Sequence, residues 1–272
     1  YISTCKREFK PQTKFQYSCL NYITLQHIIE TITGQSLRDF AKENIFDILG
    51  MQYTDYLPTI QQQDGKWINT VACPWMDRIA PTEKQKDGSV LCGQVHDPLA
   101  RILNGGISGN AGIFSNANDI GILAAALLNG GEYNGRRILS PLGVKTMCTV
   151  PRELTAFGRT PGWDIFSPYA SNKGDLFSPN TFGHTGYTGT SIIIDPDNDT
   201  AVILLVNAVH PEDRHSIVRL RSLVANAVAA SICPPAQVYT DHYYKRFLQF
   251  ETETPISPKD IVMAVSYTHL TL

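Results

Sequence analysis

The segment TSIIIDPDNDTAVILLVNAV, residues 190–209, constrains the fold of this chain more than any other stretch. Two runs rich in β-branched residues flank Asp-Pro-Asp-Asn-Asp, a group of residue types that favour tight turns. The segment therefore predicts two antiparallel strands joined by a short turn. The stretch that follows, residues 216–232, predicts an amphipathic helix whose apolar stripe consists of Ile217, Leu220, Val224 and Val228.

Helical signals fill much of the chain before this hairpin. NYITLQHIIETITG, residues 21–34, repeats apolar residues at helical spacing and ends at Gly34, a good C-cap. SLRDFAKENIFDILG predicts a second helix with Ser36 as its N-cap; its inward residues are Leu37, Phe40, Ala41 and Ile45. FSNANDIGILAAALLNGG predicts a third, capped by Ser115 or Asn118, and LSPLGVKTM a fourth, which begins at Ser140 and Pro141. Helices, then a hairpin, then a terminal helix favour an α+β architecture with helices packed on an antiparallel sheet.

Composition excludes several classes of function. The net charge of -2 over 272 residues gives no electrostatic footprint for nucleic acid, and no stretch approaches the ~20 apolar residues of a membrane-spanning helix. The six cysteines include no C-x-x-C pair, which excludes a zinc ribbon, and we expect them to be buried apolar side chains rather than disulfides. Residues 52–110 are mostly irregular, and a connection of this length is usually functional.

Two serine motifs are present, but neither fits its chemistry. GGISGNAG, residues 105–112, fails the G-x-S-x-G pattern because Asn110 stands at the last glycine, so we interpret it as a turn before the third helix. STCK, residues 3–6, fits the S-x-x-K pair of acyl-transfer enzymes, in which the lysine must lie one helical turn after the serine. Because Lys6 runs into REFKP, which has no apolar periodicity, we interpret this match as a coincidence.

Histidines offer a weaker site of another class. A metal hydrolase could use His96, His210 and His215, but Pro211 prevents an uninterrupted helix between the last two, and solvation in a loop is the simpler interpretation. His96 with Asp97 is more simply explained as a pair that holds a loop by hydrogen bonds. No phosphate-cradling glycine motif is present, and we expect no cofactor and no metal.

Two segments remain that combine reactive side chains with an unusual backbone. YSCLNY, residues 17–22, places a tyrosine just before a helix, where its phenol can reach a cleft; a phenol with a pKa near 10 is a poor base unless cations stabilise its anion. GHTGYTGTS, residues 183–191, opens the strand of three isoleucines with glycines, a histidine and hydroxyls. Glycines weaken a strand interior, so either this segment lies close to a neighbouring backbone or a ligand approaches its edge.

Together and in this order, these segments resemble the class C β-lactamases and penicillin-binding-protein-like serine hydrolases. FQYSCLNYITLQHIIETITGQSLRDFAKENIFDILGM resembles their Tyr-x-Asn region, FGHTGYTGTSIIIDP their Lys/His-Thr/Ser-Gly motif, and NAGIFSNANDIGILAAALLNGG the segment between the two. The similarity runs from about Phe15 to Ile232, and the APTE and VHD stretches resemble an esterase-like, β-lactamase-related subgroup. The resemblance implies a β-lactamase/transpeptidase-like fold, with an antiparallel sheet flanked by helices and a helical and irregular subdomain.

The resemblance also implies roles for individual residues. Tyr17 would shuttle the proton between nucleophile and leaving group, and His184, in place of the usual lysine, would hydrogen-bond the tyrosine or the substrate. Thr185 would contact the carboxylate or carbonyl of the substrate, and Gly186 would let the acyl group lie against the strand. The backbone N–H of Tyr187 would be one oxyanion donor.

Two positions depart from the family pattern. Cys19 stands where the motif has asparagine, which puts the contact to the substrate amide in question. The Ser-x-x-Lys of the family, on a buried helix well upstream of the tyrosine, has no counterpart, since only ten residues separate Lys6 from Tyr17. We therefore expect the C-terminal part of a serine acyl-hydrolase whose N-terminal part is missing, acting through an acyl-enzyme on an ester, a D-amino-acid peptide or a β-lactam, and inactive as it stands. The alternative is a non-catalytic module that binds cell-wall peptide or a protein partner.

The expected organisation follows from these assignments. Residues 1–235 are predicted to form the partial hydrolase domain and 236–264 a linker or the start of a further segment. Residues 265–272, in VSYTHLTL, differ in character from the acidic segment before them and are predicted to be a non-native tail. The resemblance implies a small-molecule or peptidoglycan-like substrate and a periplasmic or extracellular location.

Overall fold

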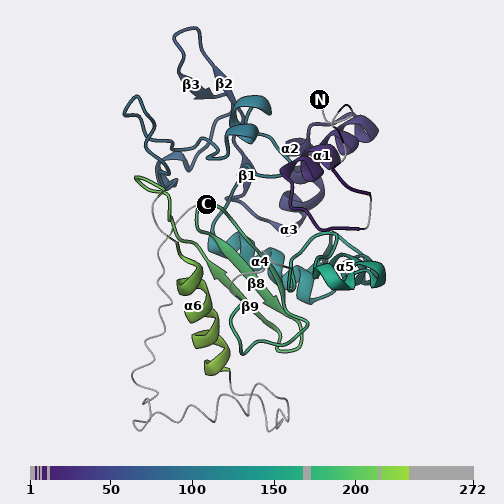
Figure 1. Ribbon diagram of the computed structural model, residues 1–272. Helices are drawn as coiled ribbons and strands as arrows, with labels where there is room; N and C mark the ends of the chain where they lie inside the picture. Colours follow the sequence, from purple (N-terminus) through teal and green to yellow (C-terminus); the bar gives the residue numbers. More distant parts are fainter. Residues whose placement is uncertain are drawn as a thin grey trace, which may run out of the picture.

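A three-stranded antiparallel sheet in the order β7-β8-β9 lies at the centre of the fold (Figure 1). The computed structural model describes Thr4, Lys6 and residues 8–10, 13–167, 173–213 and 216–232, with the side chains of residues 153 and 154 excepted. The strands are β7 (Phe182–Thr185), β8 (Ser191–Asp195) and β9 (Thr200–Leu204). The hairpin predicted around Asp-Pro-Asp-Asn-Asp is thus confirmed as β8 and β9. The predicted segments 236–264 and 265–272 lie outside the described residues.

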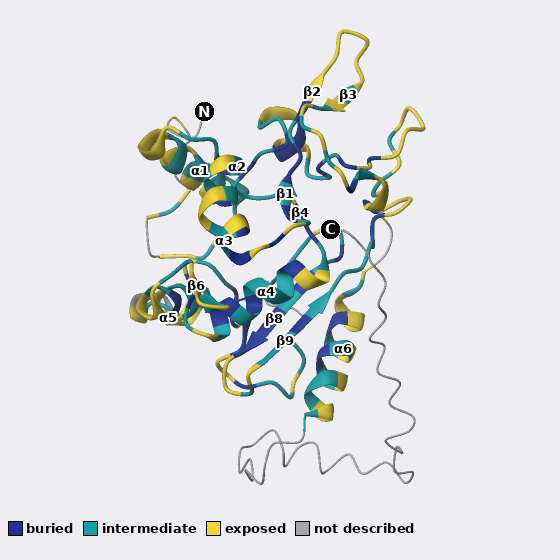
Figure 2. Cartoon of the chain, turned by 180° about the vertical axis from the view of Figure 1, so that it is seen from behind, coloured by how far each residue is buried: buried dark blue, intermediate teal, exposed yellow. Residues whose placement is uncertain are grey.

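Helices cover both faces of this sheet. Because alternate residues of a strand point to opposite faces, Ile194 packs with Leu127 of α4 (Ala117–Leu128), whereas Ile193 packs with Ala225 of α6 (Val218–Ser231). Figure 2 shows buried residues gathered along β8 and on α4. The predicted α+β architecture, with helices packed on an antiparallel sheet, is confirmed.

The N-terminal helices form a second packed unit above the sheet (Figure 1). Its elements are α1 (Cys19–Thr33), α2 (Leu37–Ala41), the π-helical turn η2 (Lys42–Phe46) and α3 (Asp47–Leu49). The predicted caps are confirmed: Gly34 ends α1 with a φ of 70°, and Ser36 Oγ accepts a hydrogen bond from Asp39 N at 3.1 Å. Both motifs are local, so they form as the sequence predicts.

The remaining elements are short, and those between residues 52 and 110 fit the mostly irregular connection expected there. Strand β1 (Asp55–Tyr56) pairs with β4 (Ile113–Phe114), β2 (Thr59–Gln61) with β3 (Trp67–Asn69), and β5 (Glu132–Tyr133) with β6 (Arg136–Arg137). The helical pieces are η3 (Met76–Arg78), η4 (Leu99–Leu103), α5 (Pro141–Cys148) and η5 (Arg152–Phe157). A separate apolar cluster that includes Leu57, Trp75 and Phe114 holds the irregular region together.

Three local predictions are wrong. Asn116, rather than Ser115 or Asn118, caps α4, because its side chain accepts from Asp119 N at 2.8 Å. On α6 the buried residues are Arg221 and Ala225, whereas Leu220 of the predicted stripe is exposed. The cysteines that the structure describes are free thiols, but Cys92 is exposed and the other three are half-buried, so the expectation of full burial fails for them.

Candidate active site

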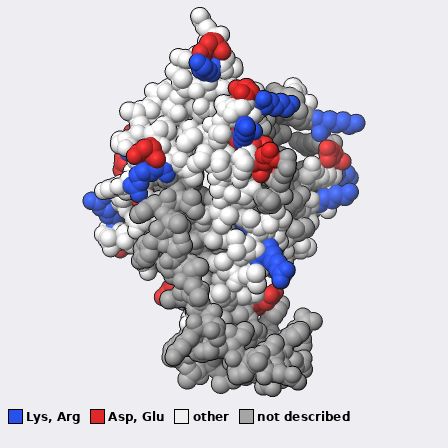
Figure 3. Space-filling view, turned by 90° about the vertical axis from the view of Figure 1, so that its left-hand side faces the viewer, with Lys and Arg blue, Asp and Glu red and all other residues white. Residues whose placement is uncertain are grey.

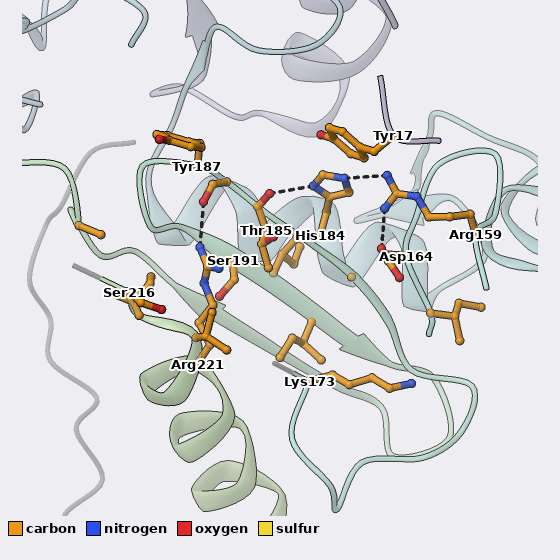
Figure 4. A pocket seen from close by; sticks show the side chains of 18 of the residues that line it. Tyr17, Arg159, Asp164, Lys173, His184, Thr185, Tyr187, Ser191, Ser216 and Arg221 are labelled. Carbon is orange, nitrogen blue, oxygen red and sulfur yellow. Dashed lines mark hydrogen bonds and ion pairs between the residues drawn. The ribbon is translucent and has the colours of Figure 1, made fainter. Parts of the chain in front are cut away.

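A pocket of about 460 Å³ runs along β7 and the turn that follows it (Figure 4). Five of the six residues predicted for the site line this pocket: Tyr17, His184, Thr185, Gly186 and Tyr187. Cys19, the sixth, begins α1 and is not among the lining residues. The pocket therefore unites the tyrosine segment with the GHTG segment, and it leaves Cys19 outside.

The GHTGYTGTS segment is a hairpin and does not form the start of one strand. Its first residues form β7, which pairs with β8 in a register that sets Gly183 opposite Ile193 and Thr185 opposite Ser191. A turn over residues 186–190 joins the two strands, closed by a 2.7 Å hydrogen bond from Gly186 N to Thr190 O. Gly189 has a φ of 124°, a conformation that other residues rarely adopt. The prediction of a single glycine-opened strand is wrong because the turn reverses the chain within the motif.

The close approach inferred for the glycines is partly a packing requirement. A Cβ on Gly183 would overlap Ile192 O of the neighbouring strand, and one on Gly186 would overlap Thr190 Oγ1 across the turn. Glycine at these two positions lets β7 and its turn lie against their own neighbours. The suggested role of Gly186 in admitting an acyl group stays a prediction.

Tyr17, His184 and Arg159 converge at one end of the pocket (Figure 4). The guanidinium carbon of Arg159 lies 5.4 Å from the centroid of the Tyr17 ring, and Arg159 Nη2 lies 3.5 Å from His184 Nε2. The Nδ1 atom of His184 lies 3.0 Å from Thr185 O. Arg159 is itself anchored, since its Nη1 donates to Asp164 Oδ2 at 2.7 Å.

The surroundings shift the pKa of both titratable groups. Burial, followed by the positive charge of Arg159, lowers the pKa of His184, so the ring is neutral at neutral pH. Burial and the nearby Cys19 raise the pKa of Tyr17, while Arg159 acts in the opposite direction. The arginine is therefore the cation that favours a phenolate at this tyrosine, because opposite charges nearby stabilise the charged form.

Tyr187 lies at the other end of the pocket, on the turn after β7 (Figure 4). Its side chain is 75% exposed, donates a hydrogen bond to Asp213 Oδ2 and stacks on the His96 ring, with the ring centroids 5.6 Å apart. Its backbone N–H makes no hydrogen bond to any residue that the structure describes. A backbone donor on a fixed turn has the character of an oxyanion donor.

Arg221 of α6 holds this turn from below, and sequence reasoning missed it. The side chain is 7% exposed, and its Nη2 donates to Gly186 O at 2.8 Å and to Thr190 O at 2.9 Å. Those two carbonyls bracket the Gly186–Thr190 turn. An arginine inside an apolar helical stripe was the available signal, because a buried arginine needs acceptors.

The other candidates are not among the residues that line this pocket, although His96 stacks on Tyr187. His96 Nε2 lies 3.2 Å from Glu83 Oε2, and His210 Nδ1 lies 2.7 Å from Thr82 O, so both histidines serve loop contacts. His215 lies outside the described residues, and within the described part of the chain no group of three or more His, Cys, Asp or Glu is placed to hold a metal. Ser108 of GGISGNAG is buried and bonded to Asn104 and Asn110, as a structural turn requires.

The surface shown in Figure 3 carries positive and negative side chains interspersed among uncharged ones. None of the helices in the described ranges has the length and apolar character needed to cross a bilayer.

Comparison with known sequences places the whole described core within one family. The model of the family described as Beta-lactamase matches residues 1–226. A relative from Escherichia coli (strain K12), named "Putative D-alanyl-D-alanine carboxypeptidase", is 36% identical over 217 residues, which cover 75% of this chain and 47% of the relative. The chain thus spans about half the length of the curated relatives it matches.

Solved structures agree on the fold. A beta-lactamase from Mycobacterium bovis aligns with a TM-score of 0.53 at 19% identity, over 82% of this chain and 66% of that one. The simvastatin synthase of Aspergillus terreus aligns with a TM-score of 0.56 at 16% identity, over 83% of this chain and 57% of that one. At these identities the likeness concerns the fold, and it confirms the predicted β-lactamase/transpeptidase-like architecture.

Proposed function

Because this chain belongs to the beta-lactamase family, we propose that its pocket is one wall of a serine acyl-hydrolase active site for peptides that end in D-alanyl-D-alanine. One observation carries the proposal: Tyr17 and the His184–Tyr187 segment, far apart in the sequence, line the same pocket. The name of the Escherichia coli relative supports a D-amino-acid peptide over the ester and β-lactam alternatives.

In this proposal Tyr17 handles the proton. The nucleophilic hydroxyl gives its proton to the Tyr17 phenolate as it attacks. The resulting phenol passes that proton to the leaving amine as the acyl-enzyme forms, which restores the phenolate. Arg159, 5.4 Å from the ring, supplies the positive charge that a transient phenolate needs. His184, whose pKa is lowered by burial and by Arg159, is neutral and cannot replace that charge.

The turn after β7 would bind the reacting carbonyl. The Tyr187 N–H is the proposed oxyanion donor, and the loss of one such donor typically costs ~10²–10³ in rate. Thr185 would contact the terminal carboxylate of the substrate from the end of β7, while Cys19, outside the pocket, would not take the asparagine's place beside the substrate amide. Arg221 supports this wall, because it holds the carbonyls at both ends of the turn.

The binding of a dipeptide tests the substrate class directly. We expect N-acetyl-D-Ala-D-Ala to shift the backbone amide NMR signals of Thr185, Gly186 and Tyr187, and N-acetyl-L-Ala-L-Ala to leave them in place. Thr185→Val, which removes the hydroxyl at constant shape, should weaken binding about 3–10-fold, equivalent to about one neutral hydrogen bond. Equal shifts with both dipeptides would refute the proposed substrate.

The nucleophile is proposed to lie outside these 272 residues. STCK, residues 3–6, is the only S-x-x-K match, and Lys6 precedes Tyr17 by too few residues to complete the fold. We therefore expect the chain to hydrolyse neither a chromogenic ester nor a chromogenic cephalosporin above the buffer rate. Hydrolysis that disappears in Ser3→Ala would show this assignment to be wrong, and dipeptide binding without turnover by a longer protein carrying Ser-x-x-Lys would favour the non-catalytic module.

A further inference from the structure

The turn that carries Arg159 is built onto β7 beside His184. Asp164 pairs with Gly183 through two backbone hydrogen bonds. Asp164 N donates to Gly183 O at 2.9 Å, and Gly183 N donates to Asp164 O at 3.0 Å. Thr160 Oγ1 accepts from Trp163 N at 2.6 Å, which closes the turn between Arg159 and Asp164. The turn also meets α1, because the Tyr22 hydroxyl donates to Pro161 O at 3.1 Å. The position of Arg159 is therefore tied to both segments of the proposed site.

The side chain of Arg159 is held as firmly as its backbone. It is 15% exposed and forms an ion pair with Asp164, which is 9% exposed. Asp164 is in turn fixed by Ser167, whose N–H and hydroxyl both donate to it, at 3.1 Å and 2.5 Å. The Phe15 and Tyr17 rings also lie near the guanidinium, with centroids 5.9 Å and 5.4 Å from its carbon. A planar cation between a carboxylate and aromatic faces is a favourable setting for arginine.

The hydrogen-bond contacts of His184 are compatible with a single tautomer of its imidazole ring. A carbonyl oxygen can only accept, so His184 Nδ1, 3.0 Å from Thr185 O, carries the proton. A guanidinium has no acceptor, so the Nε2 atom that faces Arg159 must present its lone pair. Both contacts are satisfied only by the neutral ring protonated at Nδ1.

We propose that Arg159 is a positioning residue of this site, which fixes His184 as the neutral Nδ1–H form and orients the Tyr17 ring beside it. The proposal deepens the proposed function, since it concerns the same two side chains, but it does not depend on the identity of the substrate. The charged and titratable groups nearest His184 are Arg159 and Asp164 from the turn and Tyr17 from the N-terminal segment. The pocket is also lined by Lys173, Tyr187, Asp213 and Arg221. Arg159 contacts both His184 and Tyr17.

Nitrogen-15 NMR of the histidine ring tests this proposal on the full 272-residue chain. In the unchanged protein the His184 ring, assigned with a His184→Gln sample, should give the pattern of the Nδ1–H form at neutral pH. Arg159→Gln should mix in the Nε2–H form and raise the titration midpoint of the ring, because a neighbouring positive charge is gone. In a separate titration at alkaline pH, the Tyr17 phenol should titrate at a higher pH than in the unchanged protein.

Arg38→Gln is the matched control. Arg38 also forks onto a carboxylate, with Nε and Nη2 at 2.9 Å and 2.6 Å from the two oxygens of Asp55, and its side chain is 20% exposed, but it lies on α2. This change should leave the signals of His184 and Tyr17 unaltered.

Arg159→Lys separates charge from geometry. A lysine keeps the positive charge but loses the planar fork, so the midpoint of His184 should stay low while the two neutral ring forms mix. Arg159→Lys can also replace Arg159→Gln as the test if the latter does not fold. The dispersion of the amide NMR signals shows whether each variant is folded. An unchanged ring form and midpoint in either folded variant would overturn the proposal. Failure of dipeptide binding would instead refute the substrate assignment and leave this result standing.

Discussion

Replacing Gly189 with alanine is expected to destabilise the folded chain by about 3–5 kcal/mol, from backbone strain and overpacking together. Gly189 is buried and has a φ of 124°, which an alanine adopts only under strain. An added Cβ would overlap Val206 O and lie 3.0 Å from Ala208 N, and both are backbone atoms that cannot swing away. The turn is tied to this same segment by the 2.7 Å hydrogen bond from Ala208 N to Thr188 O.

The loss of stability can be measured by urea unfolding of the Gly189→Ala variant, with Gly135→Ala as the comparison. Gly135 has a φ of 73° but nothing within 4 Å of the position of its Cβ, so it carries the backbone strain without the clash. Its replacement should cost only about 1 kcal/mol. Equal losses in the two variants would show that the close approach of the turn to residues 206–208 is not what selects glycine there.

Asp195→Asn is expected to cost about 3 kcal/mol at neutral pH, because it places an amide among four donors that all point at a carboxylate. Asp195 is 0% exposed and accepts from Ser178 N, Ser178 Oγ, Asp197 N and Asn198 Nδ2 at 2.7 to 3.0 Å. These contacts join the loop that precedes β7 to the turn that follows β8. The change should therefore loosen the strand that carries His184 as well as lower the free energy of unfolding.

The same carboxylate predicts a dependence on pH. Burial alone would raise the pKa of Asp195, but the donors from Ser178, Asn198 and Asp197 outweigh it and hold the pKa below its usual value. A lowered folded-state pKa means that the stabilisation is fully present above the unfolded pKa, near 3.9, and is lost as pH falls through the folded value. The stability difference from Asp195→Asn should thus shrink below about pH 4.

Asp197→Asn is the control for this series. Asp197 is two residues along the same turn and is exposed, and its carboxylate accepts only from Asn180 Nδ2 among the hydrogen bonds of the described residues. Its replacement should change the free energy of unfolding by less than about 0.5 kcal/mol at any pH. A comparable loss in both variants would contradict a special role for the buried carboxylate.

Much of the candidate site could be predicted from residue order. The tyrosine before an apolar helix and the GHTG segment before three isoleucines are both local patterns, and the structure brings them to one pocket. Cys19 is not among the residues that line that pocket, and its assignment to substrate binding stays a prediction. Its position in the motif was taken from the resemblance, whereas the direction of its side chain depends on how α1 packs.

The two arginines could not be predicted in the same way. Arg159 lies in RTPGWD, whose Pro-Gly pair signals a turn but not its neighbours, and its contacts come from the pairing of this turn with β7. Arg221 sits in a helix whose apolar period suggested another buried stripe, and it is buried because Gly186 O and Thr190 O offer it acceptors. The secondary-structure propensities of neighbouring residues do not predict which backbone carbonyls will lie close to a helix in the folded protein.

Caps, hairpin turn and helical periods are interactions between residues a few positions apart, so their order along this chain sufficed to give the α+β architecture. The electrostatic character of the pocket arises from contacts across longer separations, such as the 35 residues between Arg221 and Gly186 and the 25 between Arg159 and His184. Burial, which only the packed structure creates, then lowers the pKa of His184 and raises that of Tyr17. The residue types in the sequence therefore identified the candidate catalytic side chains. The packing of β7 against the Arg159 turn and α6 determined the charge states and neighbours of those side chains.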